Sequence, residues 1–115
     1  MMNNQEYTDK VISSGIEYTV NAFSSGVKLW YLNGKLHRED GPAVEWANGS
    51  KEWRVDGKRH RVDGPAVEWA DGDKEWYLND ELHREDGPAI ESANGSKEWW
   101  VDGEELTEEE FNSRN

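Results

Sequence analysis

Three histidines recur at intervals of 23 residues, and an arginine directly follows each of them. The pairs are His37-Arg38, His60-Arg61 and His83-Arg84. A histidine could bind a metal ion or transfer a proton, but the adjacent cation disfavours a metal, and the three copies are equivalent. We therefore expect repeated structural elements and no metal site. In each, the His or Arg would bond to the Asp of the same turn, Asp40, Asp63 or Asp86.

Carboxylates are the second group that could do chemistry. The chain has 25 Asp and Glu residues, so some pair will lie at a catalytic separation by chance. A glycosidase-like pair needs one carboxyl with a raised pKa in a pocket beside an ionised partner, which evenly repeated glutamates on an open sheet do not provide. No Gly-rich phosphate loop, nucleophile elbow or H-E-x-x-H motif is present. The sequence predicts a protein that is not an enzyme and has no cofactor.

Two further positions of the repeat carry side chains that could recognise a partner. The first set is Tyr31, Arg54, Tyr77 and Trp100, and the second is Glu45, Glu68 and Glu91. On an outer face the first set forms a row that either packs across strands or binds a partner, since Tyr, Trp and Arg are enriched at hot spots. The glutamates beside it repel one another unless a cation lies nearby, which favours a role in binding.

The period of 23 residues organises most of the chain. It is carried by four tryptophans, Trp30, Trp53, Trp76 and Trp99, and by Gly-Pro-Ala triplets that begin at Gly41, Gly64 and Gly87. Half-copies flank three full copies, so residues 20–105 form one repeat array. Because each copy is too small to bury its own tryptophan, neighbouring copies must stack. Residues 1–19 are an N-terminal tail or a capping strand.

Asn-Gly and Asp-Gly pairs divide each copy into short strands. Asp56-Gly57 exemplifies one phase of the repeat and Asn48-Gly49 the other. Such pairs favour type I′ turns, and the residues between them alternate in polarity as in strands. The Gly-Pro pairs mark a bend in the longer strand, because proline cannot donate to a ladder. We expect an all-β fold of stacked antiparallel β-hairpins that form an elongated, curved single sheet.

The alternation also predicts two faces. We expect the four repeat tryptophans on an apolar face, with the Tyr31 set and the Glu45 set on the opposite one. The companion strand supplies the rest of the apolar face: Phe23, Val44, Trp46, Val67, Trp69 and Ile90. Ser92 replaces the expected tryptophan in the last full copy, so the core should thin there.

A short helix is expected in residues 106–115. Thr107 and Glu110 have the spacing of a capping box, and the acidic residues of the first turn suit the helix dipole. Leu106 and Phe111 are spaced for a hydrophobic staple across the helix start. This helix would cap the exposed edge of the sheet.

Composition excludes several classes of partner. The formal net charge is −12 and there is no cysteine. A surface this acidic repels duplex nucleic acid and anionic lipid. No apolar run approaches the ~20 residues of a membrane span, and the polar start MMNNQEYTDK is unlike a signal peptide. We expect a cytoplasmic protein that binds neither membrane nor duplex nucleic acid.

The unit resembles the MORN repeat in the stretches Trp53 to His60 and Trp69 to Asp73. It differs in one consistent way, because HR-x-DGPA replaces the usual H-G-x-G. With its L-T-E-E-E-F ending, the chain is similar to short repeat proteins of bacteriophages and bacteria. The resemblance implies stacked hairpins that serve as a scaffold or binding surface. It also implies a phage-encoded accessory protein in the host cytoplasm, such as an inhibitor of a defence protein.

Three functions are compatible with these features. The array could bind a protein with a basic surface, with fast association that salt weakens. Alternatively, aromatic pockets could sequester a nucleotide-type ligand whose phosphate meets arginines such as Arg38, Arg54, Arg61 or Arg84. The third possibility is a purely structural or assembly module. The exposed sheet edges also allow a homo-oligomer.

Overall fold

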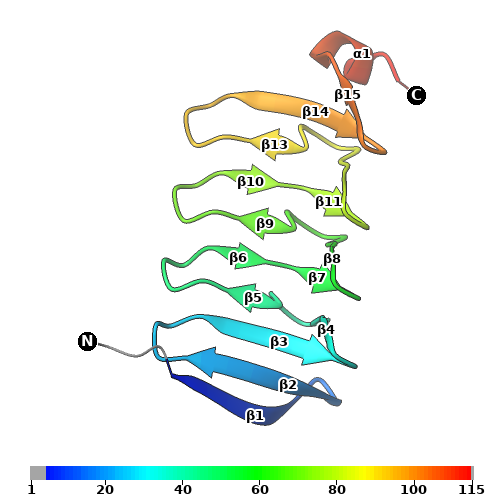
Figure 1. The fold of residues 1–115 in the computed structure, drawn as a ribbon. Coiled ribbons are helices and arrows are strands. Elements are labelled where there is room, and N and C mark those ends of the chain that lie inside the picture. Colours follow the sequence, from blue (N-terminus) through cyan, green and yellow to red (C-terminus); the bar gives the residue numbers. More distant parts are fainter. Residues whose placement is uncertain (1–4, 115) are drawn as a thin grey trace.

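The computed structural model describes residues 5–114 as a stack of antiparallel β-hairpins, 51 × 35 × 19 Å in extent, as Figure 1 shows. The strands of the stack are β1 (Glu6–Ser13), β2 (Ile16–Phe23), β3 (Lys28–Leu32), β5 (Val44–Glu45), β6 (Lys51–Glu52), β9 (Val67–Glu68), β10 (Lys74–Glu75), β13 (Ile90–Glu91), β14 (Lys97–Val101) and β15 (Glu104–Leu106). The hairpin tips hold β4 (Lys35–Leu36), β7 (Arg54–Val55), β8 (Lys58–Arg59), β11 (Tyr77–Leu78) and β12 (Glu81–Leu82). The expected all-β fold is confirmed.

The strands pair in an almost sequential order. The main sheet runs β1-β2-β3-β5-β6-β9-β10-β13-β14-β15, with β4 paired to β3, and every pair is antiparallel. Two tips, β7-β8 and β11-β12, are separate two-stranded sheets, so the structure adds small sheets to the single sheet that the sequence predicts. Both residues of the Asp56-Gly57 turn have positive φ, 50° and 82°, as a type I′ turn requires. At Asn48-Gly49 only the glycine has positive φ, 94°, so the prediction of a type I′ turn is wrong for that phase of the repeat.

Each copy contains a bend where the sequence has Gly-Pro. The Trp53 carbonyl accepts from the His60 N–H at 3.1 Å, and the Trp53 N–H donates to the Ala66 carbonyl at 2.7 Å. Residues 61–65 therefore loop out opposite a single tryptophan, so Pro65 falls where no ladder donor is needed. The bend that the Gly-Pro pairs predict is confirmed.

The register overturns the predicted faces. Directly paired residues of antiparallel strands share a face, and Val44 and Val67 both pair with Glu52. Glu45 and Glu68 pair instead with Lys51, two residues before Trp53. Val44, Val67 and Ile90 thus lie on the face of the Tyr31 row, whereas the Glu45 set shares the face of the repeat tryptophans.

The second group of tryptophans, Trp46 and Trp69, forms hydrogen bonds to glutamates that pair with the valines. Trp46 donates from Nε1 to Glu52 at 3.2 Å, and Trp69 donates to Glu75 at 2.8 Å. Val67 is fully buried, whereas Trp46 is 39% exposed. Ile90, in the copy where Ser92 replaces the tryptophan, is only half-buried, in agreement with the predicted thinning.

The N-terminal segment forms a capping hairpin over the part that the structure describes. β1 and β2 pair along eight residues each, around a turn with positive φ at Ser14 and Gly15. Tyr18 of β2 is fully buried, and its ring meets that of Trp30 edge-on at 5.5 Å between centroids. Of residues 1–19, those that the structure describes belong to this hairpin, whose second strand continues past residue 19 to Phe23. Residues 1–4 lie outside the described residues.

The C-terminal helix is present as predicted. α1 (Glu108–Asn112) begins after Thr107, whose side chain accepts from the Glu110 N–H while Glu110 accepts from the Thr107 N–H. The helix lies against β14 and β15 at the far end of the stack from β1. No helix in residues 5–114 is long and apolar enough to cross a membrane.

Candidate functional site

The bends bring an arginine onto each of the first three repeat tryptophans. The guanidinium carbon of Arg61 lies 3.8 Å from the centroid of the Trp53 ring. Arg38 lies 3.6 Å from Trp30, and Arg84 lies 3.9 Å from Trp76. These cation–π contacts were not predicted. The constant spacing of eight residues from tryptophan to arginine is the signal that could have revealed them.

Each of these arginines is also held by carboxylates and by a carbonyl. Arg61 donates to Asp63 at 3.2 Å, to Glu68 at 3.2 Å and to the carbonyl of Pro65 at 3.1 Å. A Cβ added at Gly64 would lie 2.9 Å from the guanidinium carbon, so a side chain there would displace Arg61 from its position in the bend. The bond from Arg61 to Asp63 is the one predicted between the arginine and the aspartate of the same turn.

The other two copies have the same arrangement. Arg84 bonds to Asp86 and to Glu91, both at 2.8 Å. Arg38 bonds to Asp40 at 2.9 Å and forms an ion pair of 3.5 Å with Glu45. We call the tryptophan, the arginine and the two carboxylates of one copy the bend lock.

This arrangement corrects the expectation of an acidic column without cations. Glu45, Glu68 and Glu91 each pair with the bend arginine of their own copy. Along the sheet the same glutamates alternate in register with lysines, as in the order Glu45, Lys51, Glu68. Their negative charge is thus compensated, and it gives no support to a binding role for this column.

The histidines link neighbouring copies. The Asp56 N–H at the tip of the second copy donates to His37 Nδ1 at 2.9 Å, and the Asp102 N–H donates to His83 Nδ1 at 2.9 Å. The second nitrogen of His37 lies 3.0 Å from Glu39 Oε2. Because Nδ1 accepts, Nε2 carries the hydrogen and donates to the glutamate.

His60 follows the same pattern without a carboxylate. Its Nδ1 accepts from the Asn79 N–H at 3.1 Å, while Val62 stands where the other copies have glutamate. The described residues include no group of three or more His, Cys, Asp or Glu side chains that could hold a metal ion.

The predicted recognition row is half-buried and largely bonded within the chain. Arg54 donates to Glu52 at 2.8 Å and to the Gly57 carbonyl at 2.9 Å. The Tyr77 hydroxyl donates to Glu75 at 2.8 Å, and Trp100 Nε1 donates to Glu98 at 3.0 Å. Burial, together with the hydrogen bond to Glu75, raises the pKa of Tyr77.

The bend locks also change the acidity of their aspartates. The Ser13 hydroxyl donates to Asp40, which lowers the pKa of that carboxyl to about 2 with help from Arg38 and Ser14. The hydrogen bond and charge of Arg84 lower the pKa of Asp86. Both carboxylates are stabilised in their charged form.

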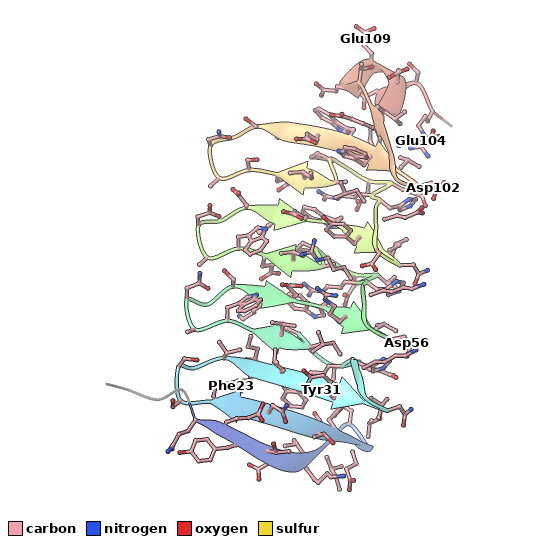
Figure 2. The ribbon with its side chains drawn as sticks, viewed as in Figure 1. Phe23, Tyr31, Asp56, Asp102, Glu104 and Glu109 are labelled. Carbon is pink, nitrogen blue, oxygen red and sulfur yellow. The ribbon has the colours of Figure 1, made fainter. Side chains whose placement is uncertain are left out.

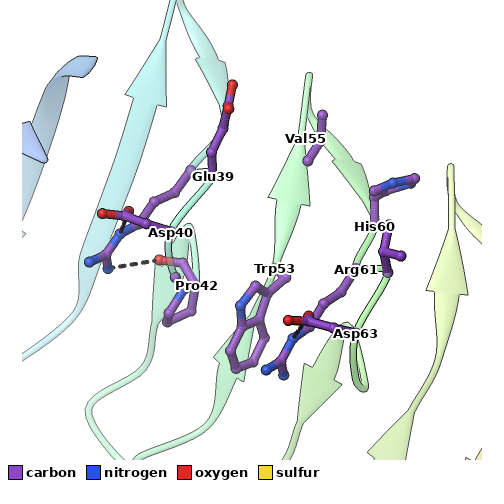
Figure 3. Close-up of a pocket in the computed structure, with 11 residues that line it drawn as sticks. Glu39, Asp40, Pro42, Trp53, Val55, His60, Arg61 and Asp63 are labelled. Carbon is purple, nitrogen blue, oxygen red and sulfur yellow. Dashed lines mark hydrogen bonds and ion pairs between the residues drawn. The ribbon is translucent and has the colours of Figure 1, made fainter. Parts of the chain in front are cut away.

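A groove of about 950 Å³ separates the first two bends (Figure 3). Trp53, Val55 and Val62 supply its apolar surface, and Arg38 and Arg61 lie along its sides. Each arginine is already bonded to an aspartate, so the groove offers no uncompensated cation to an anionic ligand.

The bends and tips leave several carboxylates exposed. Six of them, which we call the tip-edge carboxylates, have side chains that are 57–87% exposed: Glu39, Asp56, Asp63, Glu85, Asp86 and Asp102. The histidine bonds place the bend carboxylates beside those of the tips, as for Glu39 and Asp56 around His37. Figure 2 shows Asp56 and Asp102 on the same edge of the stack.

The charge is unevenly distributed along the chain. Residues 1–58 contain 8 Asp and Glu against 7 Lys and Arg, a net charge of −1. Residues 59–115 contain 17 against 6, a net charge of −11. The same repeat position at the tips is Lys35 and Lys58 in the first two copies but Glu81 and Glu104 in the next two. The acidic surface is therefore concentrated in the C-terminal half.

Comparisons of the chain with protein-family models, with curated proteins and with solved structures give no match.

Proposed function

We propose that this chain is a MORN-like, non-enzymatic binding protein whose C-terminal acidic half recognises a partner protein with a basic surface. The net charge of −11 over residues 59–115 carries this proposal. A field of one sign steers an oppositely charged partner into contact and raises the rate of association.

The state of the arginines supports a basic partner over an anionic one. In the bend locks each guanidinium bonds to carboxylates of its own copy, as Arg61 does to Asp63 and Glu68. Such paired arginines are poor receptors for phosphate unless the lock opens. The tip-edge carboxylates remain exposed and can meet the cations of a partner.

The resemblance to short phage and bacterial repeat proteins gives this surface a biological setting. We propose that the partner is a host protein, for example a defence protein that the chain inhibits in the cytoplasm. Several host proteins with nucleic-acid substrates have basic surfaces, and an acidic array could occupy such a surface.

A nucleotide sponge is the second candidate, and the groove between the first two bends favours it. Its volume of about 950 Å³ and its tryptophan suit a planar ligand. The paired arginines argue against phosphate binding there, so we rank this function second.

One experiment separates the two functions. The purified chain is immobilised, and binding is measured for a panel of basic proteins, for acidic proteins of matched size and for nucleotides, at low and at physiological salt. We expect binding of basic proteins that weakens steeply with salt, and no binding of nucleotides. Binding of a nucleotide with little dependence on salt would support the sponge, and binding of neither class would contradict both functions.

A further inference from the structure

The last repeat tryptophan lacks the arginine that covers its three counterparts. Trp30, Trp53 and Trp76 each carry a guanidinium 3.6–3.9 Å from the ring centroid, contributed by the residue eight positions later. Eight positions after Trp99 the chain has Thr107, the N-cap residue of α1. Among the described residues, no cation lies over the Trp99 ring.

A pocket of about 370 Å³ lies at this position. It is lined by Trp99, Leu106 and Thr107, and by the glutamates Glu105, Glu108 and Glu110. Lys97 also lines it, but the equivalent Lys51 and Lys74 coexist with a bend arginine in the inner copies, so this lysine does not exclude a guanidinium. Arg114, the next arginine after Trp99 along the chain, lies over Phe111 instead, 5.5 Å from its ring centroid.

The carboxylates of the pocket are available to a ligand. One oxygen of Glu110 accepts from the Thr107 N–H at 2.8 Å. Glu105 and Glu108 are exposed, and neither side chain has a hydrogen bond or ion pair to another described residue. In the inner copies two carboxylates hold each arginine. At the end of the stack carboxylates also line the pocket of the tryptophan, but Glu105 and Glu108 come from other positions of the repeat, because the counterparts of Asp86 and Glu91 are Glu109 and Arg114.

We infer that the Trp99 pocket binds an arginine side chain of the partner, which completes a fourth bend lock between two molecules. The three intramolecular locks define the ligand chemistry: a planar guanidinium stacked on tryptophan and bonded at its edge by carboxylates. A lysine fits this site less well, because its ammonium is a point charge without a planar fork. This inference rests on the proposed function and specifies which pocket recognises the basic partner and through which chemical group.

The test uses the full chain with ¹⁵N-labelled indoles and a short peptide that has one arginine between glycines. Matched peptides carry lysine or the neutral isostere citrulline at that position. We expect the arginine peptide to shift the Trp99 indole signal saturably, with the signals of Trp53 and Trp76 unchanged. The lysine peptide should bind at least about threefold more weakly, and the citrulline peptide should give no shift.

Three variants locate the site. Glu105→Gln/Glu108→Gln should weaken the arginine peptide by about fivefold or more, whereas Glu6→Gln/Glu109→Gln, with the same loss of charge outside the pocket, should bind as the wild type does. Thr107→Arg should remove binding, because the chain then fills its own pocket.

Several results would overturn the inference. The first is equal affinity for the arginine and lysine peptides, and the second is a uniform shift of all indole signals. The third is equal loss of affinity in the two double variants. Each would show unspecific attraction of the peptide to the acidic half. Such results would not contradict the proposed function if the chain still binds basic proteins in the protein panel. Absence of any response to the arginine peptide also refutes the pocket, and the protein panel then decides the proposed function separately.

Discussion

The guanidinium of Arg61 shows how one residue organises a whole copy. It covers the Trp53 ring and bonds to Asp63 and Glu68, and its side chain is 23% exposed. A cation–π contact contributes about 0.5–2 kcal/mol depending on desolvation, and charge-assisted bonds add to it. Removing the cation would also leave Glu68 without its partner. The contacts of the bend arginines within their own copies therefore stabilise the fold.

Replacing Arg61 with methionine tests this role. The change keeps a long apolar stem over Trp53 but removes the cation, so we expect the free energy of unfolding to fall by about 1–3 kcal/mol. Denaturant titration followed by circular dichroism measures it. Arg114→Met, at the exposed C-terminal end, is the matched control and should change stability by less than about 0.5 kcal/mol. Equal effects of the two substitutions would contradict the bend lock.

The lowered pKa of Asp40 predicts a pH dependence. Its carboxyl titrates at about 2 in the folded chain, against 3.8 as its ordinary value. The stability that its charge contributes is therefore fully present above about pH 4 and is lost as the pH falls towards 2. Asp40→Asn should lose less stability than the wild type between pH 4 and pH 2.

Asp63→Asn is the control, because Asp63 has the same arginine contact without the two serines. The free energy of unfolding is measured against pH for both variants. Relative to the wild type, the slope between pH 4 and pH 2 should change more for Asp40→Asn than for Asp63→Asn. If the two variants have the same slope, the serine contacts of Asp40 have no energetic effect.

At the scale of elements, hydrogen bonds between consecutive hairpins hold the stack in register. The Gly57 N–H at one tip donates to the Leu36 carbonyl of the preceding hairpin at 2.8 Å, and His37 accepts from the Asp56 N–H. At the other edge, Ser50 Oγ accepts from the Ala70 N–H at 2.8 Å. Each hairpin thus relies on its neighbours, and the first one relies on the β1-β2 cap.

Tyr18 connects that cap to the first bend. Its hydroxyl accepts from the Glu39 N–H at 3.0 Å while its ring packs on Trp30. Tyr18→Phe keeps the ring contact and removes the acceptor, so we expect a loss of about 0.5–1.5 kcal/mol. Hydrogen exchange at the Glu39 amide should accelerate as well. Unchanged exchange there would show that the cap does not hold the bend.

The elements were largely predictable from the sequence, but their relative register was not. Asn-Gly and Asp-Gly pairs located the turns, and Thr107 with Glu110 located the helix, because these signals are local. Alternation fixes which residues share a face within one strand but not how two strands pair. A shift of one residue in pairing exchanged the faces of Val44 and Glu45, and with them the predicted core.

The site was less predictable for a related reason. The Arg61 contact with Trp53 depends on a bend that loops out of the ladder, and no alternation pattern describes such a bend. The bond of Arg61 to Asp63 could be predicted, since the two residues are close in sequence. The Trp99 pocket could not be predicted, because only the structure shows that arginines lie over Trp30, Trp53 and Trp76 and that a pocket lies beside Trp99.

The whole molecule is an elongated stack with its charge at one end. It is 51 Å in its longest extent, and the C-terminal half carries nearly all of the net charge of −12. Self-repulsion in this half opposes compactness and is screened by salt, whereas the partly buried ion pairs of the bend arginines with Glu68 and Glu91 are less affected by salt. The thermal midpoint should therefore rise by a few degrees between low and moderate salt. Thermal unfolding followed by circular dichroism tests this, and a falling midpoint would mean that exposed ion pairs dominate.

The most direct test of the central claim compares two variants that lose the same charge. Glu81→Gln/Glu85→Gln/Asp102→Asn removes three carboxylates from the acidic half, and Glu6→Gln/Asp9→Asn/Glu17→Gln removes three from the N-terminal hairpin. The measurement is the affinity for a basic protein that binds the wild type, determined over a range of salt concentrations. We predict that the first variant binds about tenfold more weakly with a shallower salt dependence, and that the second binds nearly as the wild type does. Equal affinities for both variants, or binding independent of salt, would contradict recognition by the acidic half.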